Sequence, residues 1–171
     1  ADNTAPSLLG GATVTRSCEP LDVTRIGHIT KLKLVLITPE LTVLTKEARE
    51  ILPRYVSLQN FINNMANTAL MTAAFAKNDY ALFARCLDDK IIEPVRSTLI
   101  KGYQDVRKAA LGAGADGMAI SGSGPTVFAV TNNQKKAEHI KKAMINAFQN
   151  QKVKASGIVA DVDEEGTKVL D

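Results

Sequence analysis

The stretch from Gly112 to Val130, GAGADGMAISGSGPTVFAV, alternates glycine-rich segments with short apolar runs. The apolar runs are Met118–Ile120 and Val127–Val130, and residues 121–126 stand between them. Short apolar runs separated by Gly and Pro are typical of two strands joined by a turn. Because glycine adopts positive φ readily, such a turn can direct several backbone N–H groups at one point. The stretch therefore predicts a hairpin whose turn either binds an anion or simply reverses the chain.

Three familiar glycine motifs fail to describe this stretch. Gly112, Gly114 and Gly117 have the spacing of the dinucleotide-binding fingerprint, but a predicted helix precedes them and a strand follows, the reverse of that motif. Ser123 lacks the setting of a nucleophile elbow, since Ser121 stands where glycine is required and a strand follows. No Walker-type phosphate loop occurs in the sequence. These nucleotide-binding and hydrolase motifs are therefore excluded.

Composition is that of an ordinary globular protein. The chain has 171 residues, with 45% hydrophobic and 23% charged residues, enough for one domain or one domain and part of another. A net charge of +3 and 5% aromatic residues argue against a nucleic-acid partner. The sequence shows no signal peptide and no apolar run of the ~18 residues that a membrane span needs, which predicts a cytoplasmic protein without a membrane partner. Cys18 and Cys86 are expected to be free thiols, and no metal site is predicted.

Apolar patterns predict the other elements. Residues 32–37 form a β-rich run, expected to be an interior strand. Residues 45–51 should form a short helix that Thr45 caps and Pro53 ends. Apolar residues recur at helical spacing over residues 57–77, where Ser57 is the expected cap, and a second helix should follow. The same reasoning predicts two further helices and a final strand, at residues 103–111, 133–150 and 152–162.

Two adjacent acids, Asp88 and Asp89, admit two interpretations. A metal cluster is one of them, since carboxylates are metal ligands. The other is a solvated surface, because neighbours on a helix diverge and Lys90 neutralises the acids. The sequence favours the solvated surface. Over the whole chain, the order of the elements predicts an α+β fold, an antiparallel sheet covered by helices on one side.

Several segments resemble a known family. GADG at residues 114–117 and ISGSGPT at residues 120–126 are similar to the C-terminal motif of the GHMP kinases. Asp2-Asn3 followed by PSLLGG, the segment from Thr38-Pro39-Glu40 to Arg49, and the Glu93-Pro94-x-Arg96 segment narrow the resemblance to the homoserine kinase family. Lys101 departs from that pattern, in which Pro is usual before Gly-Tyr. The resemblance covers nearly the whole chain.

The resemblance implies a substrate site but neither a general base nor a metal ligand. Asp2, with Asn3 beside it, would lie by the amino group or the hydroxyl of the substrate. Arg49 and Arg96 would bind the substrate carboxylate, a task that suits the planar guanidinium group. The glycine turn would form the floor beneath the acceptor. The implied substrate-binding residues are Asp2, Asn3, Arg49, Arg96, Gly122, Ser123 and Gly124.

Family members transfer the γ-phosphoryl group of ATP, with Mg²⁺, to L-homoserine in threonine biosynthesis. Their main ATP loop lies in an N-terminal domain, and nothing like it occurs here. The resemblance thus implies that residues 1–26 are a remnant of that domain and residues 27–171 its ferredoxin-like C-terminal partner, inactive alone. Two alternatives stay open: another GHMP kinase, of mevalonate type, and a non-enzymatic amino-acid-binding module. The oligomeric state is also open, with a homodimer as one option.

Overall fold

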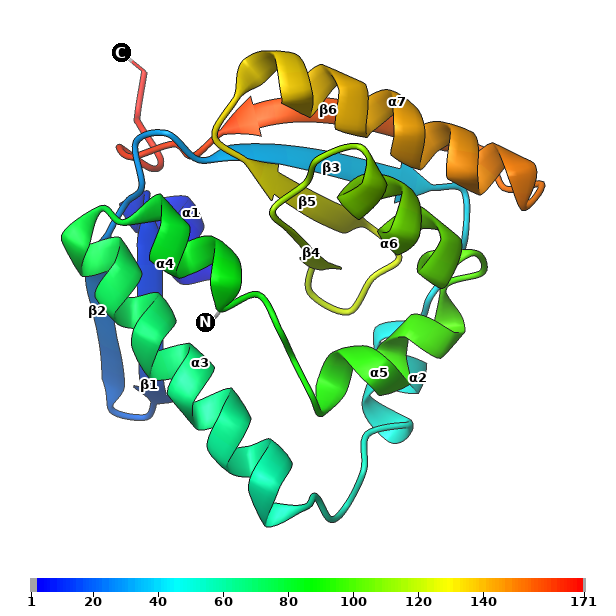
Figure 1. The fold of residues 1–171 in the computed structure, drawn as a ribbon. Coiled ribbons are helices and arrows are strands. Elements are labelled where there is room, and N and C mark those ends of the chain that lie inside the picture. The colour runs from blue at the N-terminus through cyan, green and yellow to red at the C-terminus, as the bar shows by residue number, and fades with distance from the viewer. Residues whose placement is uncertain (1–2, 171) are drawn as a thin grey trace.

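A four-stranded antiparallel sheet in the order β4-β5-β3-β6 organises the computed structural model, which describes residues 3–170 (Figure 1). Its strands are β3 (Lys33–Pro39), β4 (Gly117–Ile120), β5 (Val127–Thr131) and β6 (Ala155–Asp161). Strand β4 pairs antiparallel with β5, so the predicted hairpin is confirmed. The antiparallel α+β fold expected from the sequence is confirmed with it.

Helices occupy most of the remaining chain. They are α1 (Thr4–Leu9), α2 (Thr45–Glu50), α3 (Leu58–Lys77), α4 (Tyr80–Arg85), α5 (Ile92–Arg96), the 3₁₀ turn η1 (Ser97–Leu99), α6 (Tyr103–Gly112) and α7 (Gln134–Asn150). Ser57 caps α3 as predicted, because its side chain accepts a hydrogen bond from the Asn60 amide. The predicted cap of α2 was wrong: the helix begins after Leu44, and no side chain caps it. No helix within residues 3–170 is both long and apolar enough to cross a membrane.

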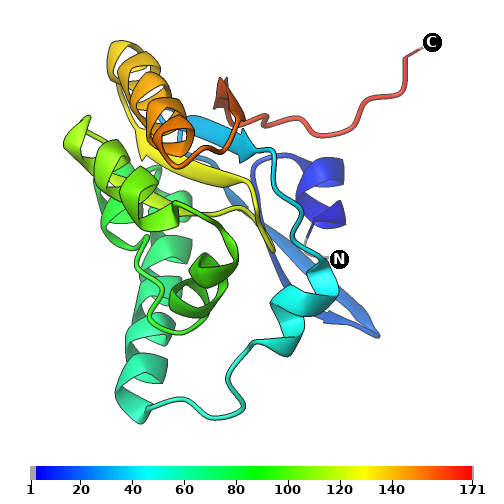
Figure 2. The ribbon, with the colours of Figure 1, turned by 90° about the vertical axis from the view of Figure 1, so that its right-hand side faces the viewer.

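The main core lies between one face of the sheet and helices α6 and α7. Antiparallel register places Val35 opposite Ala129 and Ile37 opposite Val127, and all four side chains are fully buried. Side chains four residues apart on α7 cover them, because that spacing keeps residues on one face of a helix. These are Ile140, Met144 and Phe148. Figure 2 shows α6 and α7 together on the same side of the sheet.

A smaller core covers part of the opposite face, which the sequence did not predict. Val130 points away from α7, since its neighbours on β5 point toward it. It packs in a cluster with Ala74 near the end of α3 and Phe83 of α4. Phe83 also meets the ring of Phe75 edge-on, with 5.2 Å between the ring centroids. The long helix α3 is therefore attached to the sheet by its C-terminal end.

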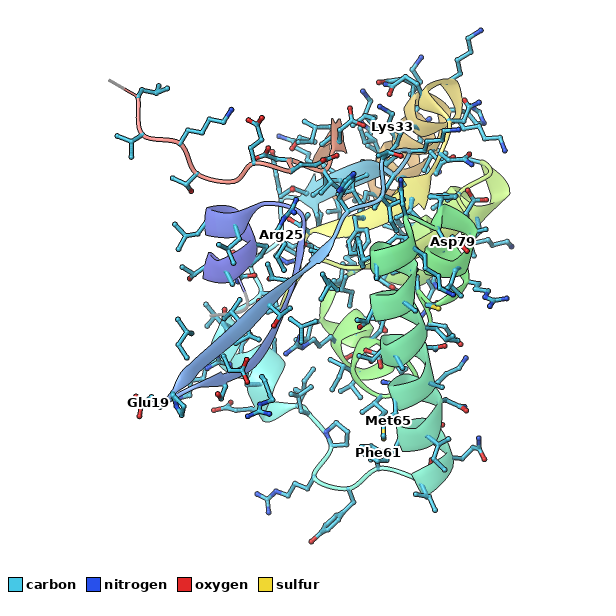
Figure 3. All side chains as sticks on the ribbon, turned by 90° about the vertical axis from the view of Figure 1, so that its left-hand side faces the viewer. Glu19, Arg25, Lys33, Phe61, Met65 and Asp79 are labelled. Atoms are coloured by element: carbon cyan, nitrogen blue, oxygen red, sulfur yellow. The ribbon has the colours of Figure 1, made fainter. Side chains whose placement is uncertain are left out.

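The N-terminal strands form a separate sheet. Strands β1 (Ala12–Cys18) and β2 (Leu21–Gly27) pair with each other and not with β3–β6. In Figure 3 this ribbon runs from Arg25, near α1, to Glu19 at its tip. The C-terminal tail holds its base, because the Gly11 amide donates to the Asp163 carbonyl at 2.7 Å and Arg25 Nη2 donates to the Glu164 carbonyl at 3.0 Å.

Candidate functional site

The glycine turn between β4 and β5 leaves backbone donors unused. Gly122 and Gly124 have φ of 59° and 83°, where glycine is favoured. The Ser121 amide donates to the Thr126 carbonyl at 2.8 Å, and the Gly124 amide donates to the Ser121 carbonyl at 3.0 Å. The amides of Gly122 and Ser123 find no acceptor within residues 3–170. Successive free amides of this kind suit an anion.

The two glycines of the turn have different surroundings. A Cβ atom at Gly122 would meet no atom within 4 Å, so the space above this residue is open. A Cβ atom at Gly124 would lie 3.1 Å from Cδ1 of Ile100, a buried residue. Gly124 therefore packs against the core, whereas Gly122 faces the open side of the site. The hydroxyls of Thr126 and Thr38 lie 3.0 Å apart and link the turn to the end of β3.

Arg96, the last residue of α5, joins this turn to α2. Its Nη1 donates to the Gly122 carbonyl at 3.0 Å, and its Nε donates to the Ala48 carbonyl at 3.2 Å. Neither bond uses Nη2. Since two backbone carbonyls orient the guanidinium group, its remaining N–H groups have a fixed direction toward a ligand.

Arg49 follows Ala48, whose carbonyl accepts a hydrogen bond from Arg96, so the two predicted arginines lie on backbone segments that this bond connects. The Arg49 side chain is exposed and makes no hydrogen bond or ion pair with any of residues 3–170. Arg96 likewise forms no ion pair with this part of the chain. Arg96 thus brings a guanidinium group without a carboxylate partner in residues 3–170 to the Gly122 carbonyl, beside the free amides of the turn.

A cavity of about 140 Å³ lies beside Arg96. Its lining residues are Asp89, Ile92, Glu93, Arg96, Ala119, Ile120 and Gly122. A second cavity of about 240 Å³, on the α3 side, shares Asp89, Glu93 and Ala119 with it. The carboxylates of Asp89 and Glu93 thus lie between α3 and Arg96, a position that the sequence analysis did not predict.

Asp89 corrects the prediction of a solvated helical surface. It lies outside any helix and is only partly exposed. Burial, the largest single influence, raises its pKa, but hydrogen bonds from three backbone amides and from Asn64 outweigh burial, so the pKa is lowered below its usual value. Lys90 does pair with the other acid, Asp88, at 2.8 Å. No group of three or more acidic, Cys or His side chains within residues 3–170 could hold a metal ion.

Glu93 has the opposite electrostatic character. Burial raises its pKa, while the neighbouring Tyr103 hydroxyl and the charge of Arg107 oppose that rise. Arg107 Nε lies 3.8 Å from the Glu93 carboxylate. Burial and the Glu93 carboxylate in turn raise the pKa of Tyr103. Of the two carboxyls that line both cavities, Glu93 is therefore the one whose pKa is raised.

The two N-terminal members of the predicted site are not tested. Asp2 lies outside the described residues. Asn3 precedes α1, which lies beside β1 and β2, at a distance from α2 and α5 in Figure 1. The structure joins Arg96 to the glycine turn through the Gly122 carbonyl, and the substrate-binding roles of all seven predicted residues stay predictions.

Comparison with known proteins finds a family model that matches part of the chain and relatives that the chain matches over part of their length. A family model described as GHMP kinases C terminal matches residues 71–150. The chain is similar to the homoserine kinase of Chloroherpeton thalassium, with 40% identity over 99% of this chain and 54% of that protein. The chain thus spans about half the length of the curated relatives it matches.

Solved structures show the same likeness. The crystal structure of homoserine kinase from Cytophaga hutchinsonii matches with a TM-score of 0.94 and 41% identity, over 99% of this chain and 54% of that one. Mevalonate kinase from L. major, solved with R-mevalonate, matches with a TM-score of 0.63 at 10% identity, over 87% of this chain and 47% of that one. The second likeness shows a shared fold alone.

Proposed function

We propose that the complete protein phosphorylates L-homoserine, because 99% of this chain is similar to part of known homoserine kinases and residues 71–150 match the model of the GHMP kinases C terminal. The γ-phosphoryl group of ATP would pass to the side-chain hydroxyl and give O-phospho-L-homoserine, an intermediate of threonine synthesis in the cytoplasm. Phosphoryl transfer depends mainly on positioning and charge neutralisation, which suits a site without an activated nucleophile.

The observation that carries this proposal is Arg96 beside the glycine turn, bonded also to the helix that carries Arg49. Arg96 is oriented by two carbonyls, and Arg49 is unpaired on the adjoining helix. In this proposal the two guanidinium groups bind the α-carboxylate of homoserine, for which the planar fork is well shaped. Gly122, Ser123 and Gly124 would then lie under the hydroxyl and the transferred phosphoryl group, where the free amides can stabilise negative charge.

Part of the proposed site would come from a preceding N-terminal domain. ATP and Mg²⁺ would bind mainly there, since the family resemblance places the main ATP loop in the N-terminal domain. Residues 1–26 would belong to that domain and residues 27–171 to the C-terminal one. Two features support this division. Helix α1 and strand β2 expose large apolar side chains, namely Leu8, Leu9 and Leu21. Strands β1 and β2 also form a sheet of only two strands, which is marginally stable in isolation. Asp2 would then hold the amino group or the hydroxyl of the substrate, with Asn3 beside it.

The test is an assay of the purified complete protein with ATP-Mg²⁺ and a set of acceptors. We expect phosphorylation of homoserine, followed as the phosphate ester by ³¹P NMR, and no turnover of mevalonate or galactose. Turnover of mevalonate instead would favour the other kinase interpretation. Homoserine binding by calorimetry, without ATP turnover, would favour an amino-acid-binding module. Residues 1–171 alone should show no turnover.

A further inference from the structure

We propose that Asn64 and Asp89 are positioning residues for Arg96: together they form a polar lock between α3 and the start of α5. This inference rests on the proposed role of Arg96 as a carboxylate ligand and adds the residues that fix its place. The lock consists of side chains that do not themselves bind Arg96. It acts through the backbone of α5, whose opposite end carries the guanidinium group.

Asp89 forms one half of the lock. Its Oδ1 accepts hydrogen bonds from the amides of Ile91 at 2.8 Å and Ile92 at 3.0 Å, and its Oδ2 accepts from the amide of Glu93 at 2.9 Å. These are amides at the start of α5, which otherwise lack acceptors within the helix. A charged acceptor makes each bond stronger than a neutral one. One carboxylate thereby sets where α5 begins.

Asn64 forms the other half, from the middle of α3. Its Nδ2 donates to Asp89 Oδ1 at 2.8 Å, and its Oδ1 accepts from the Lys90 amide at 3.0 Å. Both ends of the side-chain amide are therefore used, so the carboxylate and the backbone beside it are held together. An aspartate here would place two carboxylates against each other, and an aliphatic residue would lose both bonds.

Packing alone does not hold α5, which makes the lock important. No residue of this five-residue helix is fully buried. Because the helix is so short, a displacement at its first residue is carried to its last, Arg96. Arg96 then makes two hydrogen bonds of its own, to Ala48 and Gly122, and these need the helix end in the correct place. The polar contacts at both ends therefore determine the direction of the guanidinium group.

The chain offers a matched control for Asn64. Asn67 lies nearly one turn further along α3, and its Nδ2 donates at 2.8 Å to the Asp88 carbonyl. This bond joins the same helix to the same segment, but it does not touch the carboxylate that holds α5. A purely structural role predicts equal effects of Asn64→Ala and Asn67→Ala. A positioning role predicts that only Asn64→Ala raises KM for homoserine.

Kinetics of the complete enzyme make the first test. We expect Asn64→Ala to raise KM for homoserine about tenfold. A misplacement of about 1 Å can lower the reaction rate ~100-fold, and Arg96 would keep part of its contact. KM for ATP and kcat should change little, and Asn67→Ala should leave KM for homoserine unchanged at a comparable loss of Tm. In an Arg96→Ala background, Asn64→Ala should have little further effect on KM. The inference would be overturned if Asn64→Ala and Asn67→Ala changed KM for homoserine equally. It would also be overturned if Asn64→Ala raised this KM as much in the Arg96→Ala background as in the wild type.

A second test needs no activity. The ¹H–¹⁵N signal of Arg96 Nε should be protected from solvent exchange in the complete protein, and Asn64→Ala should remove that protection while Asn67→Ala keeps it. Protection that survives Asn64→Ala would show that the lock does not position Arg96. The proposed function fails separately, if Arg96→Ala itself leaves KM for homoserine unchanged. If Arg96→Ala raises KM and Asn64→Ala does not, only the lock is wrong.

Discussion

The two helices that carry the arginines are held in different ways. Helix α5 begins on the Asp89 carboxylate and ends with a guanidinium group bound to two carbonyls. Helix α2 has no side-chain cap, and its Arg49 has no partner in residues 3–170. One side of the site is therefore fixed before a ligand arrives, and the other keeps its side-chain freedom. In our account Arg96 sets where a carboxylate binds, and Arg49 closes on it.

Replacement of the fixed arginine should have the largest effect. A charge-assisted contact to a carboxylate is worth ~1.5–3 kcal/mol, which corresponds to ~10–150-fold in kcat/KM for homoserine. Arg96→Ala should fall near the top of this range, because it also releases the Gly122 carbonyl and the end of α5. The loss should appear as raised KM for homoserine in steady-state kinetics of the complete enzyme. Arg96→Lys should rescue poorly, since a point charge cannot replace the fork.

The unpaired arginine should give a smaller effect with a cleaner origin. Arg49→Ala should lie near the lower end, ~10-fold in kcat/KM, because an exposed side chain recovers less energy from the contact. Its Tm should match that of the wild type, since the exposed side chain makes no hydrogen bond or ion pair with residues 3–170 that the substitution could remove. A thermal melt beside the kinetics checks both points. Equal losses for Arg49→Ala and Arg96→Ala, in activity and in Tm, would remove the distinction between the two helices.

The two glycines of the turn extend the comparison to the backbone. Val at either position must adopt positive φ, a strain of about 1–3 kcal/mol. Gly124→Val would also meet Ile100, so it should lower Tm more than Gly122→Val does. Gly122→Val would instead fill open space beside Arg96, so we expect a clear loss of kcat with only a small loss of Tm. If both variants melt lower yet turn over normally, the segment is a simple hairpin turn.

Local sequence patterns predicted the hairpin of this site but not the roles of Asp89 and Asn64. Gly and Pro between two apolar runs were enough to predict the β4–β5 hairpin, because both residues strongly favour turns. The pairing of Arg49 with Arg96 came only from family resemblance, since 46 intervening residues carry no local signal. Asp89 was misassigned because its role depends on the chain leaving the helix before it. Asn64 was missed, since a polar residue on an amphipathic helix looks solvated.

The smallest expected effect concerns Glu93, a partly buried carboxyl on α5. Its pKa in the folded state is raised above the ordinary value of 4.5. The folded state therefore binds a proton more readily than the unfolded state, and this favourable contribution is complete below pH 4.5 and lost as pH rises through the folded pKa. Urea unfolding should show the wild type gaining stability relative to Glu93→Gln as pH falls from 7 toward 4.5. A difference that does not vary with pH would contradict the shift.

The central claim is that Arg49 and Arg96 together bind the α-carboxylate of homoserine. Its most direct measurement compares homoserine with 3-aminopropan-1-ol, which keeps the hydroxyl and the amine but lacks the carboxylate. The complete wild-type enzyme should prefer homoserine strongly in kcat/KM. The Arg49→Ala/Arg96→Ala double variant should treat the two acceptors almost alike, because only homoserine loses a contact. A double variant that folds normally and keeps the wild-type preference would show that the carboxylate binds elsewhere.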